Sequence, residues 1–187
     1  MGFIKTTLKD AFLFEPNVFG DHRGFFMETY NDKLFKENGF HLNFIQDNHA
    51  MSGEAGTLRG LHFQLEPYAQ TKLVRVTKGA VYDVIVDIRE GSPTYGQWEG
   101  FILSEDNKRQ LLVPRGFAHG YCTLVKNTEF LYKVDNYYSP EHDRGIAWND
   151  PNLNINWPTN NPILSEKDKH HPLLKDAGTL FIYNSEE

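Results

Sequence analysis

The sequence predicts an all-β fold, a two-sheet jelly roll or small barrel with a few short helices. Aromatic residues make up 14% of the 187-residue chain, and β-branched residues crowd its middle, which favours sheet over helix. Gly, Pro and Asn residues divide that middle into short segments, at the spacing typical of a sandwich or barrel. We find no repeat or linker. We therefore expect one domain over residues 1–187, with a jelly-roll core at about 40–140 and a C-terminal segment that completes a functional site.

The expected strands pack one face and leave the other face for a ligand. Alternation over residues 82–88 predicts a half-buried antiparallel strand, with two aspartates on its less apolar face. In residues 60–65 the apolar side chains share one face, and His62 and Gln64 lie on the opposite face. A jelly roll can line a cavity with such a face. The polar residues that we expect to face this cavity are Arg59, His62, Gln64, Lys72 and Arg75.

Helix signals are few. Residues 31–39, NDKLFKENG, combine an Asn start, an apolar pair and a Gly stop, which predicts one short helix. The segment LSEKDKHHP predicts the start of another helix near the C-terminus. In it, Ser165 and Asp168 have the spacing of a capping box, which by itself explains Asp168 as a structural residue.

The composition excludes several functions. A net charge of −6 argues against broad nucleic-acid binding, because neutralising a phosphate backbone needs a basic face. Cys122 is the single cysteine, so no intrachain disulfide and no cysteine-based zinc site is expected, as suits a reducing cytosol. The start MGFIKTTLKD lacks the apolar stretch of a signal peptide, and no run of about 18 apolar residues occurs. We expect a cytoplasmic protein that binds neither nucleic acid nor membrane.

One segment resembles half of a metal site. Residues 114–120, PRGFAHG, have the Pro-x-Gly-x-x-His spacing of the second motif of cupin barrels. The first motif of such barrels offers His-x-His, whereas this chain has Gln64 in place of the second histidine. Gln is a poor ligand for Zn, Fe or Mn compared with imidazole or carboxylate. We therefore predict no catalytic metal, and expect His119 to form hydrogen bonds or tune charge in the cavity.

Without a metal, His62 becomes a candidate general base, since imidazole titrates near neutral pH and a carboxylate can orient it. A lone histidine on a strand is as often a satisfied structural residue. Lys72 and Arg75 also fit ordinary edge charges, and Tyr132 fits a core aromatic residue. The local sequence leaves these alternatives open.

Six segments become informative when they are seen together. They are DHRGFFMETY (21–30), IQDNHAMSGEAGTLRGLHFQ (45–64), AQTKLVRVTKGAVYDVIVDIREGSPTYGQWEG (69–100), VPRGFAHGYCTL (113–124), FLYKVDNYYSPEHDRGIAWNDP (130–151) and LSEKD (164–168). In this order and spacing they resemble the dTDP-4-dehydrorhamnose 3,5-epimerase family, over residues 14–168. The resemblance implies a cupin-like jelly roll, usually a homodimer, with no metal or organic cofactor.

The resemblance also implies a role for each matching residue. His62 would accept a proton and Asp168 would orient it. Tyr132 would donate a proton, and Lys72 would stabilise an enolate. The implied substrate contacts are Arg23, Phe26 and Glu28 from the partner subunit, Gln46, Asp47 and Asn48 at the nucleotide, Arg59 and His119 around the sugar and diphosphate, and Asp143, where Glu is common in the family, with Lys167.

The implied substrate explains these residue types. In a dTDP-4-keto-6-deoxyglucose, the C3 and C5 hydrogens both lie α to the C4 ketone, so a base can remove either one without a redox cofactor. The enolate charge on O4 then needs a preorganised cation. Inversion of both carbons would give dTDP-4-dehydro-L-rhamnose for surface polysaccharide synthesis.

Other functions stay open at this point. An epimerase that inverts only C3 or only C5 is the nearest alternative, because the same base and acid serve it. A non-catalytic nucleotide-sugar-binding barrel and a metal-dependent cupin oxygenase are further alternatives. The binding barrel is disfavoured by the joint presence of His62, Lys72, Tyr132 and Asp168. The oxygenase is disfavoured by Gln64.

Overall fold

The computed structural model describes residues 2–184 and confirms the all-β prediction. The strands in that range are β1 (Gly2–Lys5), β2 (Phe12–Glu15), β3 (Val18–Asp21), β4 (Gly24–Met27), β5 (Gln46–Ser52), β6 (Leu58–Gln64), β7 (Lys72–Lys78), β8 (Ala80–Asp87), β9 (Arg89–Glu90), β10 (Trp98–Ser104), β11 (Gln110–Val113), β12 (Phe117–Thr123), β13 (Thr128–Val134), β14 (Asp143–Gly145) and β15 (Phe181–Ile182). One α-helix, α1 (Asp32–Glu37), and one 3-10 helix, η1 (Leu174–Asp176), accompany them in the described chain.

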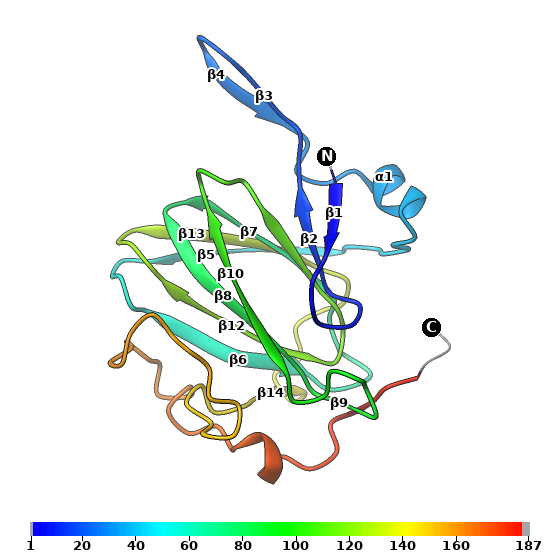
Figure 1. Ribbon diagram of the computed structural model, residues 1–187, viewed down its shortest axis with the longest axis vertical. Coiled ribbons are helices and arrows are strands. Elements are labelled where there is room, and N and C mark those ends of the chain that lie inside the picture. Colours follow the sequence, from blue (N-terminus) through cyan, green and yellow to red (C-terminus); the bar gives the residue numbers. More distant parts are fainter. Residues whose placement is uncertain (1, 185–187) are drawn as a thin grey trace.

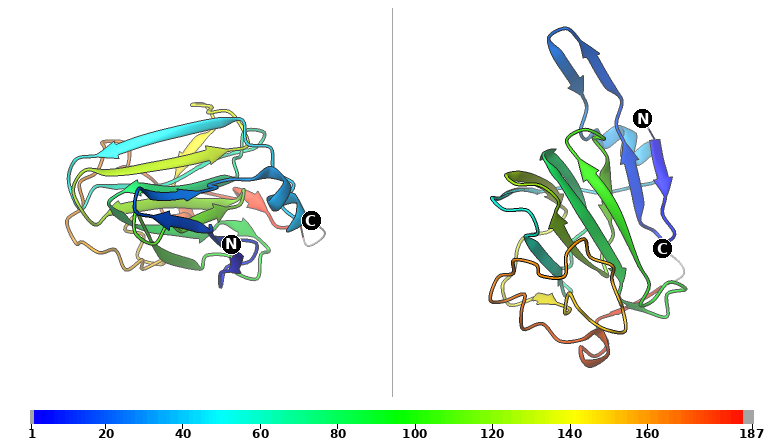
Figure 2. Two further views of the ribbon diagram at one scale, coloured as in Figure 1. Left: turned by 90° about the horizontal axis from the view of Figure 1, so that it is seen from above. Right: turned by 60° about the vertical axis from the view of Figure 1, so that its left-hand side comes forward.

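Two antiparallel sheets form the body and lie as stacked layers (Figures 1 and 2). The first has six strands in the order β1-β2-β11-β7-β13-β5, and the second has five in the order β10-β8-β12-β6-β14. Strands that are distant in sequence are therefore neighbours, as jelly-roll connections require. β1 and β2, which lie outside residues 40–140, extend the first sheet through the pairing of β2 with β11.

An apolar cluster fills the space between the sheets. The six-stranded sheet contributes Val74, Leu111 and Phe130, and the five-stranded sheet contributes Ile85 and Leu103. Alternate side chains of each strand point into this layer, which is the way that packed sheets bury their inner faces.

A second apolar cluster covers the outer face of the five-stranded sheet. Val84 and Val86 of β8 pack there against Ile146, Leu153 and Leu174, which lie in the C-terminal part of the chain. In Figure 1 this part is drawn in orange and red and runs alongside the lower edge of the body. The predicted antiparallel strand over residues 82–88 is therefore confirmed, but its half-burial is wrong, because a distant segment covers its second face.

One predicted helix is confirmed and the other is wrong. In α1 the side chain of Asn31 accepts a hydrogen bond from the Leu34 N–H, and Phe35 is fully buried against Phe14. Residues 166–169 of the LSEKDKHHP segment form a turn instead of a helix. The segment offers no apolar stripe to bury, and its Asp168 side chain bonds to strand β6 instead.

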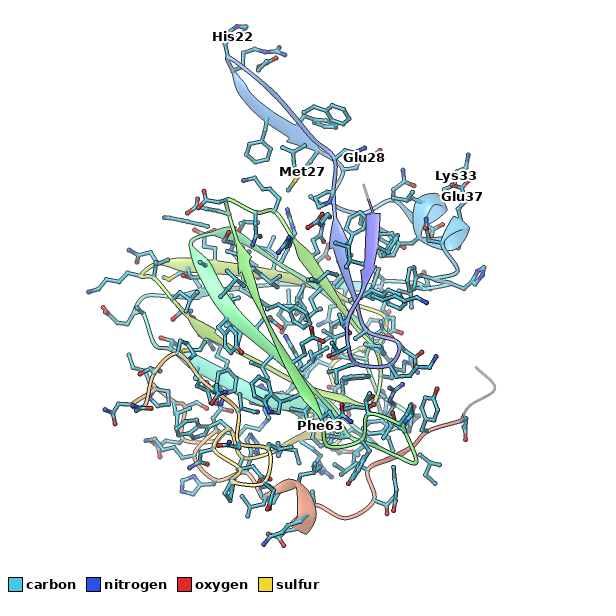
Figure 3. The ribbon with its side chains drawn as sticks, in the orientation of Figure 1. His22, Met27, Glu28, Lys33, Glu37 and Phe63 are labelled. Carbon is cyan, nitrogen blue, oxygen red and sulfur yellow. The ribbon has the colours of Figure 1, made fainter. Side chains whose placement is uncertain are left out.

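The hairpin of β3 and β4, here called the arm, projects from the body in all views (Figures 1 and 2). Its aromatic side chains are unusually accessible, since Phe19, Phe25 and Phe26 are 63%, 57% and 68% exposed. Figure 3 places His22 at the tip of the arm, far from Phe63 in the body. The arm thus presents apolar surface that the described part of the chain leaves uncovered.

Within residues 2–184, no helix combines the length and the apolar character that a membrane span needs.

Candidate active site

An irregularity in β6 brings Arg59 and His62 to the same side of the strand. Two residues of β6, 60–61, stand opposite the single residue Gly120 of β12. Such a bulge reverses the side-chain alternation. Position 60 requires glycine, because its φ is +133° and a Cβ there would lie 2.5 Å from the Cα of Gly120.

The bulge faces a cavity of about 410 Å³ between the two sheets. β6 and β12 supply one wall, β5, β7 and β13 supply the opposite wall, and residues 163–168 close one side. Seven of the predicted site residues line it, and they are Arg59, His62, Lys72, His119, Tyr132, Lys167 and Asp168. The cavity is rich in cationic and imidazole groups, which suits an anionic ligand.

His62 and Asp168 form a hydrogen-bonded pair in this cavity. The Nε2 atom of His62 lies 2.5 Å from Oδ1 of Asp168, whose side chain is 3% exposed. The other carboxylate oxygen, Oδ2, accepts a hydrogen bond of 2.8 Å from the Ser165 hydroxyl. Burial by itself would raise the pKa of Asp168, but the hydrogen bonds from His62 and Ser165 outweigh burial and hold it below its usual value.

The pairing also fixes which nitrogen of His62 can act as a base. A charged Asp168 accepts the proton that the ring carries on Nε2. The lone pair of the neutral imidazole then lies on Nδ1, the nitrogen that is free to take a proton from a ligand.

Ser165 shows that Asp168 also has the local role suggested by its spacing. The Asp168 N–H donates a hydrogen bond of 3.1 Å to the Ser165 Oγ. A helix-capping serine accepts the same hydrogen bond, although no helix follows here. The local contact and the contact with His62 therefore exist together.

Tyr132 lies on the wall opposite His62. It belongs to β13 of the six-stranded sheet, whereas His62 belongs to the five-stranded sheet, and both line the cavity between them. Burial raises the pKa of Tyr132, and the charge of Arg59 acts in the other direction. Its hydroxyl is thus protonated at neutral pH and available as a donor.

Lys72 begins β7 and points into the same cavity. Burial lowers the pKa of Lys72 to about 8, while the charges of Asp143 and Asp83 favour the protonated form. Lys72 therefore remains mostly an ammonium group at neutral pH.

His119 lines the cavity from β12 and is anchored from behind by a residue that local sequence patterns did not single out as functional. Its Nε2 lies 2.9 Å from Oδ1 of Asp83, a carboxylate with no solvent exposure. Burial raises the pKa of Asp83, and the interaction with His119 opposes that effect. The signal in the sequence was an aspartate inside the apolar run of β8, which a buried partner explains.

Gln64 and Arg75 do not face this cavity, so the prediction for these two residues is wrong. The amide of Gln64 bonds to backbone groups, donating to the carbonyls of Tyr68 and Tyr137 and accepting from the N–H of Ser139. Arg75 lies an odd number of positions from Lys72 in β7, so it faces the opposite side of the sheet and lines a separate cavity of about 190 Å³.

Two of the three predicted nucleotide-contacting residues, Asp47 and Asn48, line that second, smaller cavity, and Tyr132 borders both cavities. The Gln46 amide donates to Asn48 Oδ1 at 2.9 Å, and Lys133 forms an ion pair with Asp47. Strand alternation places Asp47 on the outer face of the six-stranded sheet, whereas Gln46 and Asn48 share the inner face with Ala50, which lines the first cavity.

Asp143 lies beside the cavity and does not line it. Its carboxylate forms an ion pair with Lys167 and accepts a hydrogen bond of 3.1 Å from Tyr138. Asp143 instead lines a neighbouring cavity of about 510 Å³.

The remaining predicted contacts, Arg23, Phe26 and Glu28, lie on the arm or at its base, and none of them lines the cavity of their own chain. Figure 3 shows Glu28 at the base of the arm. Arg23 pairs with Asp21 at the tip, and Glu28 accepts from the Asn31 amide at the base.

His171 is a further residue near His62 that the sequence did not single out. Its Nε2 lies 3.4 Å from Asp168 Oδ1, and its ring packs against Gly145. Among the described residues, His62, Asp168 and His171 are the one group of at least three side chains whose spacing could hold a metal ion.

Comparison with known proteins gives consistent matches over most of the chain. The model of the dTDP-4-dehydrorhamnose 3,5-epimerase family matches residues 5–176. A dTDP-4-dehydrorhamnose 3,5-epimerase from Shigella flexneri is 56% identical over 178 residues, which cover 95% of this chain and 98% of that protein.

Two solved structures are also similar. The dTDP-4-dehydrorhamnose 3,5-epimerase of Bacillus anthracis, with TDP and PPi bound, is 59% identical, with a TM-score of 0.90 and coverage of 92% of this chain and 98% of that one. The dTDP-6-deoxy-D-glucose-3,5-epimerase of Legionella pneumophila, in complex with dTDP-4-keto-L-rhamnose, is 45% identical, with a TM-score of 0.93 and coverage of 98% and 99%.

Proposed function

Because the chain belongs to the dTDP-4-dehydrorhamnose 3,5-epimerase family, we propose that it converts dTDP-4-dehydro-6-deoxy-D-glucose to dTDP-4-dehydro-L-rhamnose by inverting C3 and C5. The observation that carries this proposal is the His62–Asp168 pair, which shares one cavity with Lys72 and Tyr132. The whole chain would act as a single domain, in which residues 163–168 complete the site built by the two sheets. The buried thiol of Cys122 fits a reducing compartment, and we propose the cytoplasm.

Proton abstraction is the first step of the proposed reaction. Nδ1 of His62 removes the hydrogen from C3 or C5, each of which is acidified by the C4 ketone. The ring then carries two protons and a positive charge, which the adjacent carboxylate of Asp168 stabilises. The electrons of the broken C–H bond move to O4 and form an enolate.

The enolate needs a fixed positive group in a cavity that excludes bulk water. Lys72 lines the cavity and can supply this charge. A preorganised charge of this kind stabilises the transition state without the cost of reorganising solvent.

Inversion requires that the new proton reach the face opposite the base. Tyr132 is suited to this step because it lies on the facing wall of the cavity and its raised pKa keeps the hydroxyl protonated. His62 and Tyr132 would thus work from the two sides of the sugar ring.

The diphosphate would lie toward Arg59, and the nucleotide would lie toward the arm of the partner subunit. Arg59 supplies a guanidinium at the cavity, and guanidinium groups bind phosphate oxygens in a forked geometry. We propose a homodimer in which Arg23, Phe26 and Glu28 of one protomer's arm reach the nucleotide at the site of the other. The exposed aromatic side chains of the arm support this arrangement.

Mixed dimers test this sharing. The double variant Arg23→Ala/Phe26→Ala removes the arm contacts, and His62→Ala removes the base, so each variant alone should be inactive. If the arm serves the partner, coexpression gives hybrid dimers in which one of the two sites has an intact arm and an intact base, and activity returns. No recovery in purified hybrids would show that each arm serves its own chain.

Proton NMR in deuterated water tests the reaction itself. The enzyme should place deuterium at both C3 and C5 of dTDP-4-dehydro-6-deoxy-D-glucose and yield the L-rhamno product. Deuterium at one carbon only would identify a single-site epimerase. An unchanged sugar would refute the proposed function.

A further inference from the structure

We infer that His62, Asp168 and His171 form a binding site for a transition-metal cation such as Zn²⁺, and that a cation bound there inhibits the enzyme. The inhibitory effect rests on the function proposed above, whereas the binding site does not. Two imidazoles and one carboxylate form a ligand set that suits Zn²⁺.

The three ligand atoms already lie close together. One ring nitrogen of each histidine and one carboxylate oxygen of Asp168 are all within 4.8 Å of one another. Tetrahedral ligands at zinc distances stand about 3.3–3.5 Å apart, and His171 Nε2 is 3.4 Å from Asp168 Oδ1. The 2.5 Å contact between His62 and Asp168 must open to admit the ion, which replaces the proton between them.

The Nε2 atom of His171 is available as a ligand within residues 2–184. Its Nε2 is buried and has no hydrogen-bond partner there, which is costly for a polar atom. The ring is held in place by Gly145, which pairs with His62 in the sheet, since a Cβ at Gly145 would lie 2.5 Å from His171 Nε2. The imidazole is therefore presented to Asp168 by the fold, with an unshared nitrogen.

The surroundings support an ion as well. The Ser165 hydroxyl donates to Oδ2 of Asp168 and leaves Oδ1 to face both histidines. Lys167, which lines the cavities on both sides of the group, has its charge paired with Asp143. Because His62 lines one of these cavities and His171 the other, the ion can be reached from solvent, and a water molecule can complete its coordination.

Bound metal would block catalysis through the tautomer of His62. A cation on Nε2 takes that lone pair, and the neutral ring then carries its proton on Nδ1. Nδ1 has no lone pair left to accept the substrate proton. Inhibition therefore requires no contact between the metal and the sugar.

The test compares two substitutions one residue apart. His171→Phe replaces the imidazole with a ring that has no nitrogen, and His170→Phe makes the same change at an exposed histidine. Binding of ZnCl₂ is measured without substrate, by competition with a chromophoric chelator, and epimerase activity is measured with and without ZnCl₂. EDTA should restore the rate of the inhibited enzyme, and MgCl₂ should not inhibit, because Mg²⁺ prefers oxygen ligands.

The wild type and His170→Phe should bind Zn²⁺ and be inhibited by it, whereas His171→Phe should bind at least about tenfold more weakly and resist inhibition to the same degree. Equal Zn²⁺ affinity in all three proteins, or Zn²⁺ binding without inhibition of an active enzyme, would overturn the inference. If His171→Phe lowers the melting temperature, His171→Asn replaces it in the same comparison. Should the protein lack epimerase activity, loss of Zn²⁺ binding in His171→Phe would still establish the site, so the two proposals fail separately.

Discussion

The side chains of His62 and Asp168 meet at 2.5 Å although 106 positions separate them in the chain. β6 supplies the histidine from a bulged strand, and a turn after the last large strand supplies the carboxylate. The carboxylate has a pKa below its usual value, so it is charged at neutral pH and holds the Nε2 proton of the ring. This single contact determines the nitrogen with which His62 acts.

Replacing Asp168 with Asn should lower turnover, because the proton of the neutral His62 ring would move from Nε2 to Nδ1. The amide would present an N–H to Nε2 of His62, so the ring would keep its proton on Nδ1 and lose its base there. The loss should be smaller than the factor of about 10²–10⁴ that a positioned general base contributes, because the imidazole remains in the cavity. Steady-state rates and melting curves of the two proteins measure both effects.

Ser165→Ala is the matched control for that variant. It removes the two local hydrogen bonds to Asp168 and leaves the contact with His62. We expect the free energy of unfolding to fall by about 1 kcal/mol with little change in turnover. If Asp168→Asn behaves like Ser165→Ala, Asp168 is a structural residue alone.

The variant Tyr132→Phe should separate hydrogen exchange from inversion. His62 can still remove a proton, and solvent deuterium can return by the same face, so the substrate should exchange without giving the L-configured product. NMR in deuterated water follows both processes in one sample. Tyr137→Phe, at a residue that is 61% exposed, is the control and should invert normally. Inversion by Tyr132→Phe at the parental rate would assign the donor role to another group.

Lys72 should give the pH profile a decline on its alkaline side. Burial lowers its pKa to about 8, so the ammonium group that stabilises the enolate loses its proton, and its charge, as the pH rises through that value. The value of kcat/KM should therefore fall between about pH 7 and pH 9.

Lys72→Arg tests the assignment, because a guanidinium stays protonated over this range. Whatever activity the variant retains should no longer decline near pH 8. An unchanged decline in Lys72→Arg would assign that titration to a different group.

The sequence predicted the all-β class because alternation and turn residues are local signals. It also placed Leu61 and Phe63 on a strand face apart from His62, and this is confirmed, because Leu61 and Phe63 belong to the outer apolar cluster whereas His62 lines the cavity. The full burial of β8 could not be predicted, because the residues that cover its outer face come from a distant part of the chain.

The site was harder to predict than the fold. Arg59 and His62 share the cavity only because two residues of β6 oppose one residue of β12, and strict alternation would separate them. Asp83 gave only the signal of an aspartate inside an apolar run, and His171 gave none, because the partners of both residues lie on other elements. Gln64 follows the strand alternation, but its amide does not reach the cavity, because it bonds to backbone groups of Tyr68, Tyr137 and Ser139.

Deuterium exchange by His62→Ala tests the central claim most directly. The variant lacks the nitrogen that removes the substrate proton, while the other cavity residues remain. Exchange at both C3 and C5 should fall by a factor of about 10²–10⁴ relative to the wild type, and binding of dTDP should be nearly unchanged. Exchange at either carbon close to the wild-type rate, in a variant that binds dTDP normally, would contradict the assignment of His62 as the base.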